Sequence, residues 1–219
     1  MQPKLLIHLT MKKLGLFLLK HNIHIMTLIF VGWAMWAACH WAELLLLQKL
    51  VLGLYAWLIV HEYEESYKDR FLELMLGNMM GIDHRTLTPG IAHIAQALYI
   101  TIIFSLALLF PNQLWMTFSL LILCCFEGFI HNWGIFLFRL KGVSPGWWTG
   151  MGMAAYAIWC IVQINQNIDY NGIQWLWGVL WFYACFMAME IFFQNLIGNT
   201  LSNIKTHAQA FLKKRFGKA

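Results

Sequence analysis

Six long stretches of the sequence carry few or no charged residues, and short polar or Pro/Gly-containing segments separate them. A helix that crosses the hydrocarbon core of a bilayer needs about 20 predominantly apolar residues. Because backbone groups in lipid must be hydrogen-bonded within their own segment, each stretch is expected to be an α-helix. The predicted helices cover residues 23–42, 44–60 with a continuation beyond residue 60, 91–110, 114–138, 147–166 and 175–197.

The segments between these stretches contain residues that typically interrupt helices. Pro111 begins a short turn, residues 165–172 form a polar loop, and Pro-Gly pairs precede the third and fifth predicted helices. Only residues 41–43 separate the first two helices, so this boundary is the least well defined.

The positions of the basic residues predict the orientation of the chain. Every lysine and arginine except Lys49 lies before the first predicted helix, between the second and third, between the fourth and fifth, or after the sixth. Cytoplasmic loops are enriched in Lys and Arg, so both termini are expected in the cytoplasm. We therefore predict an all-α membrane protein of the cell membrane, with a six-helix transmembrane domain over residues 23–198. Basic amphipathic segments over residues 1–22 and 199–219 are expected to lie at the inner membrane surface.

Composition supports a membrane protein and excludes several other classes. Hydrophobic residues make up 60% of the chain and charged residues only 11%, against about 25% charged in soluble domains. The net charge of +5 follows from the predicted topology, so it does not indicate binding to nucleic acid. The five cysteines lie in apolar segments without CxxC spacing, which argues against a disulfide scaffold. The sequence also has no Gly-rich phosphate loop, G-x-S-x-G or H-E-x-x-H motif.

Ionisable residues at membrane depth are costly and usually functional. His61, Glu64 and Glu65, at the inner end of the second helix, share one helical face because they are spaced i, i+3 and i+4. Glu62 is expected to point away from that face, and the whole run is alternatively explained as the solvated end of a helix.

Further ionisable residues lie in the predicted cytoplasmic halves of the other helices. Glu127 and His131 are four residues apart on the fourth helix, with Asn132 beside them. Glu190 is inside the sixth helix and His93 begins the third. Packing contacts between helices alternatively explain these residues, and a helix cap explains His93.

One combination of motifs resembles a known family. Residues 61–65 read H-x-x-E-E, a second histidine follows at His131, and residues 143–146 read V-S-P-G. Over roughly residues 30–165 the chain resembles the HXXEE-motif family of small bacterial membrane proteins, which carry this pentapeptide, another histidine and a Y-x-P-G element. The resemblance implies no particular reaction, and Val143 stands where the family has tyrosine. It implies the following key positions: His61, Glu64, Glu65, His131, Pro145 and Gly146.

The preferred hypothesis is a membrane enzyme that binds a divalent metal, zinc or iron, and acts on a lipid or lipid-linked substrate. Histidines and carboxylates on adjacent helices are typical ligands of these metals. The expected metal ligands are His61, Glu64 and His131, with Glu190 as a further candidate. Glu65 or Glu127 is the expected general base, Asn132 a further catalytic candidate, and the remaining candidates are His93, Pro145 and Gly146.

Three other functions are consistent with the same residues. A Glu–His pair can catalyse hydrolysis, acyl transfer or isomerisation without metal. A small transporter would use the same buried groups to bind an ion or relay protons. A structural assembly factor would leave the buried glutamates unexplained. The sequence does not indicate the oligomeric state.

Overall fold

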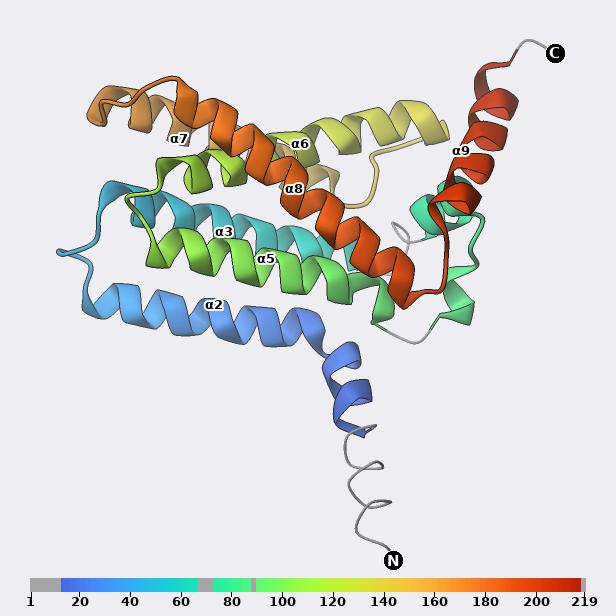
Figure 1. The fold of residues 1–219 in the computed structure, drawn as a ribbon, viewed down its shortest axis with the longest axis horizontal. Coiled ribbons are helices and arrows are strands. Elements are labelled where there is room, and N and C mark those ends of the chain that lie inside the picture. Colours follow the sequence, from blue (N-terminus) through green and yellow to red (C-terminus); the bar gives the residue numbers. More distant parts are fainter. Residues whose placement is uncertain (1–12, 67–72, 88–89, 218–219) are drawn as a thin grey trace, which may run out of the picture.

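All regular structure in the part of the chain that is described is helical. The computed structural model describes residues 13–66, 73–87 and 90–217, which form a bundle of long helices (Figure 1). The long helices are α2 (Asn22–Cys39), α3 (Leu46–Ser66), α5 (Ile91–Leu109), α6 (Leu114–Phe138), α7 (Trp147–Asn167) and α8 (Ile173–Leu196). Three shorter elements are η2 (Glu73–Met80), η3 (His84–Thr86) and α9 (Leu201–Phe216). The prediction of an all-helical protein is confirmed.

The helix boundaries agree with the predicted segments except between the first two. Helix α2 ends at Cys39 and α3 begins at Leu46, so the turn is longer than residues 41–43. Helix α3 then continues to Ser66, which keeps the whole H-x-x-E-E motif on one continuous helix. Its acidic residues are therefore not the start of a solvated loop.

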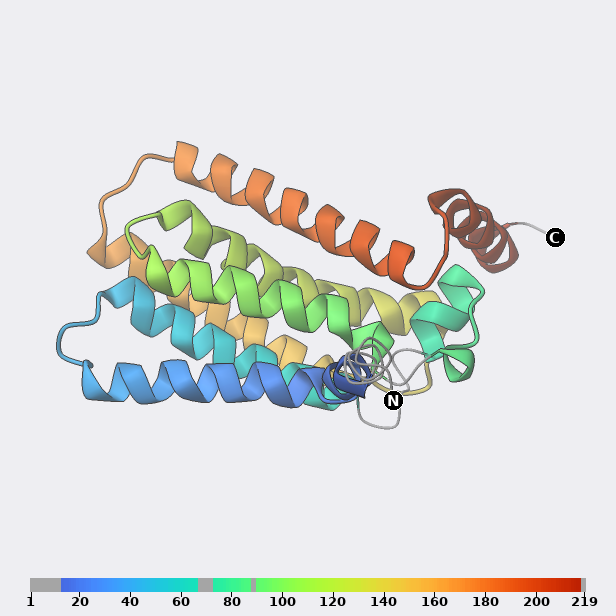
Figure 2. The same ribbon diagram turned by 60° about the horizontal axis from the view of Figure 1, so that its bottom comes forward.

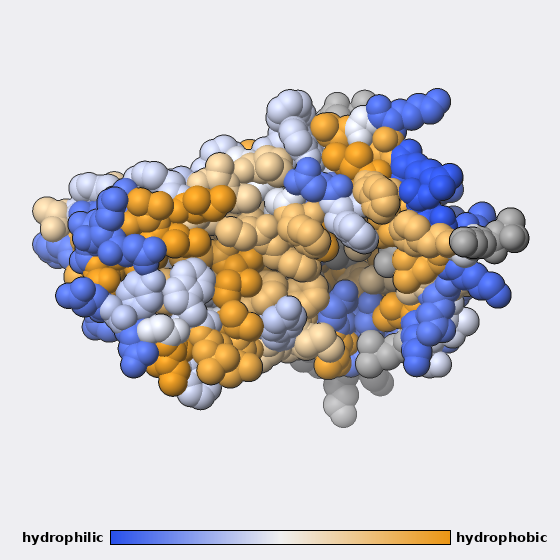
Figure 3. Space-filling model, turned by 90° about the horizontal axis from the view of Figure 1, so that it is seen from above, coloured by the Kyte–Doolittle hydropathy of each residue, from blue (hydrophilic) through white to orange (hydrophobic). Residues whose placement is uncertain are grey.

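Three of the helices, α2, α6 and α8, are long and apolar enough to cross a membrane. Large apolar side chains point outward from them, for example Leu28 and Met35 on α2, Phe129 on α6 and Ile191 on α8. Hydrophobic residues cover much of the face drawn in Figure 3, and the most hydrophilic residues gather toward its ends. Such extensive exposed apolar surface is unfavourable in water and favourable in lipid, as expected for a membrane protein.

Helices α3 and α6 lie side by side within the bundle. Helix α3 packs against α2, α5, α6 and α7, and α6 packs against α3, α5, α7 and α8. Figure 2 shows the bundle from a second direction, with α8 running along its outer side. The apolar core along α3 includes Leu54, Tyr55 and Leu58, all at most 1% exposed. The core thereby holds the two helices that carry the candidate histidines together.

Small residues let the backbones of α6 and α7 approach closely. A Cβ atom added at Gly128 of α6 would lie 2.7 Å from Ala154 Cβ and 3.2 Å from the Gly150 carbonyl oxygen. Small residues at such contacts are typical of membrane helix pairs. This contact holds the first turns of α7 against α6.

The described parts of both terminal segments lie at the same end of the bundle (Figure 1). Residues 13–20 are helical and lead into α2, whereas residues 1–12 lie outside the described residues. Helix α9 carries Lys213, Lys214 and Arg215 in its last turn. The Arg215 guanidinium donates to the carbonyl oxygens of Leu137 and Phe136, at 2.9 and 2.8 Å. This contact satisfies carbonyls at the carboxyl end of α6 and is favourable with the helix dipole.

We predict that replacing Gly128 with leucine destabilises the bundle, because its side chain has no space between α6 and α7. Overpacking of this kind costs about 1–3 kcal/mol and should lower the thermal unfolding midpoint in detergent. The matched control is Gly32→Leu on α2, where an added Cβ meets nothing within 4 Å. An unchanged midpoint for Gly128→Leu would show that the close α6–α7 contact is not formed.

Candidate metal centre

Each of the two central helices contributes one imidazole and one carboxylate. His61 and Glu65 are four residues apart on α3, and Glu127 and His131 have the same spacing on α6. Residues four apart share a helical face, and the α3–α6 contact turns these two faces toward each other. One ligand atom from each residue lies within 4.8 Å of the other three. The prediction that these two helices meet at His61 and His131 is confirmed.

The ligand atoms surround a small common point. The two Nε2 atoms of His61 and His131 lie 3.3 Å apart. Glu65 Oε1 lies 2.9 Å from His131 Nε2 and 3.4 Å from His61 Nε2. Glu127 Oε2 is more distant, at 3.7 and 3.9 Å from the same two nitrogens. The first three side chains are almost fully buried, whereas that of Glu127 is 18% exposed. Glu127 therefore forms the accessible side of the centre.

Two hydroxyl groups determine which nitrogen of each ring faces this point. Ser144 Oγ donates its hydrogen to the carbonyl oxygen of His131 and lies 3.1 Å from His131 Nδ1. Thr149 Oγ1 donates to Glu64 Oε2 and lies 2.9 Å from His61 Nδ1. Since each hydroxyl has already donated its only hydrogen, it accepts from Nδ1–H. In a neutral imidazole, Nε2 then carries the free lone pair and faces the centre.

This arrangement fits a bound cation. Two nitrogen lone pairs and two carboxylates facing one buried point repel each other unless a positive charge lies between them. Glu65 Oε1 makes no hydrogen bond of ordinary geometry despite its short distances to both rings. Tetrahedral zinc with Zn–N bonds of about 2.0–2.1 Å places neighbouring ligand atoms about 3.3 Å apart. The separations of 3.3 and 3.4 Å match this value, whereas Glu65 and His131 are closer, at 2.9 Å, and Glu127 lies farther out, at 3.7 and 3.9 Å. The donor set of two histidines and two carboxylates suits zinc or iron.

The Pro145-Gly146 pair closes one side of the centre. Gly146 precedes α7 with φ +79°, a conformation that favours glycine. A Cβ added there would lie 2.7 Å from His131 Cε1, 2.8 Å from Glu65 Cγ and 2.9 Å from His61 Cε1. Only a residue without a side chain fits at this position.

Glu64, which the sequence predicts as a metal ligand, lies outside the group of four in the structure. Its carboxylate accepts hydrogen bonds from the Thr149 hydroxyl and, at 2.9 Å, from the Thr149 backbone N–H. Glu64 is therefore linked to His61 through Thr149 and is not among the four converging residues. Glu65, one residue later, is in the group because the rotation of α3 against α6 brings its carboxylate to 2.9 Å from His131 Nε2. Glu62 is also outside the group of four, and its side chain is buried, at 2% exposed.

The other candidates lie outside the group of four. The Asn132 amide donates to the Gly128 carbonyl oxygen at 2.7 Å and accepts from Trp147 Nε1 at 3.1 Å, so it links α6 to α7. Glu190 Oε2 accepts from Gln194 Nε2 at 3.4 Å. His93 is buried in the first turn of α5. Glu190, the further ligand candidate, is thus not in the group of four, and the catalytic role predicted for Asn132 stays a prediction.

Sequence reasoning missed Ser144 and Thr149, the two residues that orient the rings. Both flank Pro145-Gly146, so the available signal was a hydroxyl residue on each side of an implied motif. Nothing in the spacing alone indicates which histidine each one contacts.

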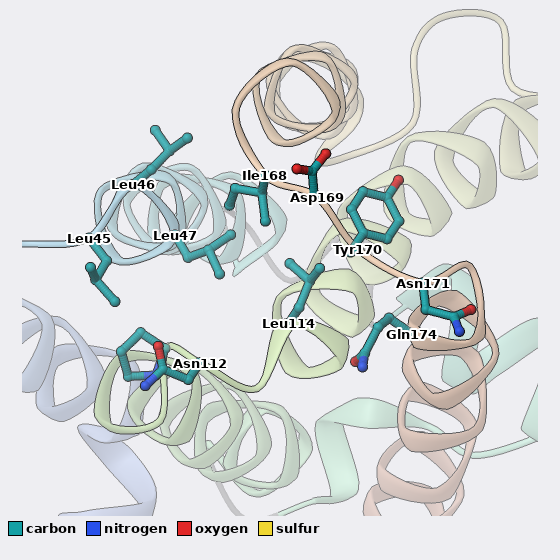
Figure 4. Close-up of a pocket in the computed structure, with 11 residues that line it drawn as sticks. Leu45, Leu46, Leu47, Asn112, Leu114, Ile168, Asp169, Tyr170, Asn171 and Gln174 are labelled. Atoms are coloured by element: carbon teal, nitrogen blue, oxygen red, sulfur yellow. The ribbon is translucent and has the colours of Figure 1, made fainter.

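Two cavities differ in their relation to the centre. One of about 190 Å³ lies among η2, α5, α6 and α8, and its polar lining residues are Gln96, Glu127 and Glu190. A larger one of about 560 Å³ lies at the opposite end of the bundle, where the α2–α3, α5–α6 and α7–α8 connections meet. Asp169 is the acidic residue among its lining residues (Figure 4). The smaller cavity, which shares Glu127 with the centre, is the one connected to the candidate chemistry.

No family model matches the sequence, and comparisons with curated proteins and with solved structures found no match. The interpretation of the centre therefore rests on its own geometry.

We predict that Gly146→Ala weakens metal binding strongly, because the new methyl group would displace the imidazoles and Glu65. Isothermal titration with zinc, on protein in lipid nanodiscs, measures the affinity. Gly142→Ala in the same loop is the control, since a Cβ there meets nothing within 4 Å. Equal affinities of the two variants would contradict the described position of the loop.

A second prediction concerns the hydroxyl that orients His61. Thr149→Val keeps the shape of the side chain but removes the hydrogen bonds to His61 and Glu64. Loss of such an outer contact typically lowers metal affinity by about 10–100-fold. Thr149→Ser, which retains the hydroxyl, should bind metal almost as tightly as the wild type. If valine and serine behave alike, the hydroxyl does not orient the ring.

Proposed function

We propose that this chain is a multi-pass enzyme of the cell membrane that uses a divalent metal, zinc or iron, to hydrolyse or transfer a group on a lipid or lipid-linked substrate. The observation that carries the proposal is the buried group of His61, Glu65, Glu127 and His131, which meets an apolar cavity through Glu127. An ion-binding group built only for stability would not need an accessible carboxylate beside a cavity.

The burial of each side chain indicates its role in the proposed centre. His61, His131 and Glu65 would hold the metal, because all three are nearly inaccessible and face one point. Glu127 is partly exposed and adjoins the cavity, so it is better placed than Glu65 to exchange a proton with water or substrate. A bound divalent metal supplies Lewis acidity, which polarises a carbonyl or phosphoryl oxygen and activates water.

We also propose that all six long helices cross the membrane, with both termini in the cytoplasm. Support comes from the distribution of basic residues along the sequence and from the packing of α3. Helix α9, with its three basic residues in the last turn, also lies at the same end of the bundle as residues 13–20 (Figure 1). Helix α3 is less apolar than its neighbours because it carries buried polar residues, among them Gln48, His61 and Glu65. A helix surrounded by other helices does not need an apolar surface on every side.

The resemblance to the HXXEE-motif family supports the same centre. The positions that it implies are the ligands His61, Glu65 and His131, together with Glu64 and the Pro145-Gly146 pair that contact or support them. We propose on this pattern that the chain is related to that family.

The arrangement favours an enzyme over a transporter. Between the distal cavity at Leu47 and the centre at His61, α3 presents Leu50, Leu54 and Leu58, each at most 2% exposed. From Leu50 to Leu58 this buried apolar face spans about 12 Å at 1.5 Å per residue. A pathway for ions would require polar groups along it.

Metal analysis of the purified full-length protein tests the proposal. His61→Ala, His131→Ala and Glu65→Gln should each lower zinc or iron affinity by more than about 100-fold, beyond the range of outer-contact changes. Binding should also weaken as pH falls, since protons compete for the ligands. His40→Ala, at the exposed end of α2, is the control and should bind metal normally.

If the folded wild-type protein binds neither zinc nor iron, the proposal of a metal-dependent enzyme is wrong. Lipid-modifying activity that persists after complete chelation would instead favour catalysis by the Glu–His pair without metal.

A further inference from the structure

An apolar groove between α5 and α8 adjoins the cavity beside Glu127. The groove has a volume of about 360 Å³ and is lined by aliphatic, aromatic and sulfur-containing side chains of these two helices. It shares Ala95 and Met189 with the cavity that Glu127 and Glu190 line. The two hollows are therefore neighbours that share part of their wall, with the two carboxylates in the wall of the smaller one; together they are called the channel below.

The dimensions of the groove match one leaflet of a bilayer. Its α5 wall extends from Ala95 to Leu106, about 16 Å of helix at 1.5 Å per residue. This is about half of the 30 Å hydrocarbon thickness of a typical membrane. Exposed apolar residues such as Leu98, Ile102 and Phe192 border the groove, so its open side faces the medium that surrounds the bundle. In a membrane that medium is lipid, and the natural occupant is a hydrocarbon chain.

The polar end of the channel offers mainly hydrogen-bond acceptors. Glu190 accepts one long hydrogen bond from Gln194, and no lysine or arginine among the described residues forms an ion pair with it. Glu127 adds a second carboxylate at the same cavity. A head group that donates hydrogen bonds would satisfy these oxygens, whereas a bare carboxylate would be repelled.

We propose that the α5–α8 groove binds one hydrocarbon chain of the substrate and that Glu127 and Glu190 receive a head group bearing amine or hydroxyl donors. The inference rests on the proposed function, because Glu127 joins this site to the metal centre. Glu190 thereby becomes a residue for head-group recognition, and the substrate class is narrowed to amphiphiles whose polar end donates hydrogen bonds. The reacting bond would lie next to that polar end, beside Glu127.

Photolabelling of the full-length protein in nanodiscs tests the site. The probes are a fatty amine, a fatty alcohol and a fatty acid of equal chain length, each with a diazirine in the chain. Mass spectrometry should map the amine and alcohol labels to the groove residues of α5 and α8, with much weaker labelling by the acid. Glu190→Gln should remove most of this discrimination between the amine and the acid.

The occupancy of the groove is tested by filling it. Ala188→Trp places a large ring in the groove and should reduce labelling about tenfold, equivalent to about 1.4 kcal/mol. Ala184→Trp is the control, one turn earlier on α8 and outside the groove. Labels spread evenly around the bundle, equal labelling by all three probes, or equal effects of the two tryptophans would each overturn the inference.

Metal affinity measured on the same samples separates this inference from the proposed function. Normal metal binding with unspecific labelling would contradict only the groove. If labelling is confined to the groove but the protein cannot bind metal, the proposal of a metal-dependent enzyme, on which the inference rests, is contradicted.

Discussion

The structure depends on the meeting of two imidazoles and two carboxylates at the contact between α3 and α6, inside an otherwise apolar bundle. Removing such groups from water is costly, and their mutual repulsion increases the cost unless a cation or shared protons compensate it. The surrounding contacts are consistent with this requirement. Ser144 and Thr149 direct both Nε2 atoms to the same point, and Gly146 leaves space for them. Because burying these four groups costs so much free energy, a function that uses them explains them best.

The packing of the bundle gives the centre one accessible side. Helix α7 begins beside the histidines and closes them off through the Pro145-Gly146 turn, while the apolar segment of α3 separates them from the distal cavity. On the remaining side, Glu127 borders a cavity that adjoins the groove between α5 and α8. Under the proposed function, this arrangement would shield the centre from bulk water and leave its open side to a substrate. This is the environment that chemistry on a membrane-embedded substrate requires.

Much of the fold and part of the centre could be predicted from the sequence. Uncharged stretches located all six long helices, because apolar length is a strong local signal. The i, i+4 spacing of Glu127 and His131 correctly paired these residues on one face. Spacing could not choose between Glu64 and Glu65, since both share a face with His61 and the choice depends on the rotation of α3 against α6 and α7. The roles of Thr149 and Asn132 were likewise set by tertiary contacts across α7, which no local pattern encodes.

X-ray absorption spectroscopy of the zinc-loaded protein in nanodiscs tests the central claim most directly. The account predicts nitrogen and oxygen ligands at about 2.0–2.2 Å, with the outer scattering of two imidazoles that falls to one imidazole in His131→Ala. Zinc bound through sulfur at about 2.3 Å, or a spectrum that His131→Ala leaves unchanged, would contradict it.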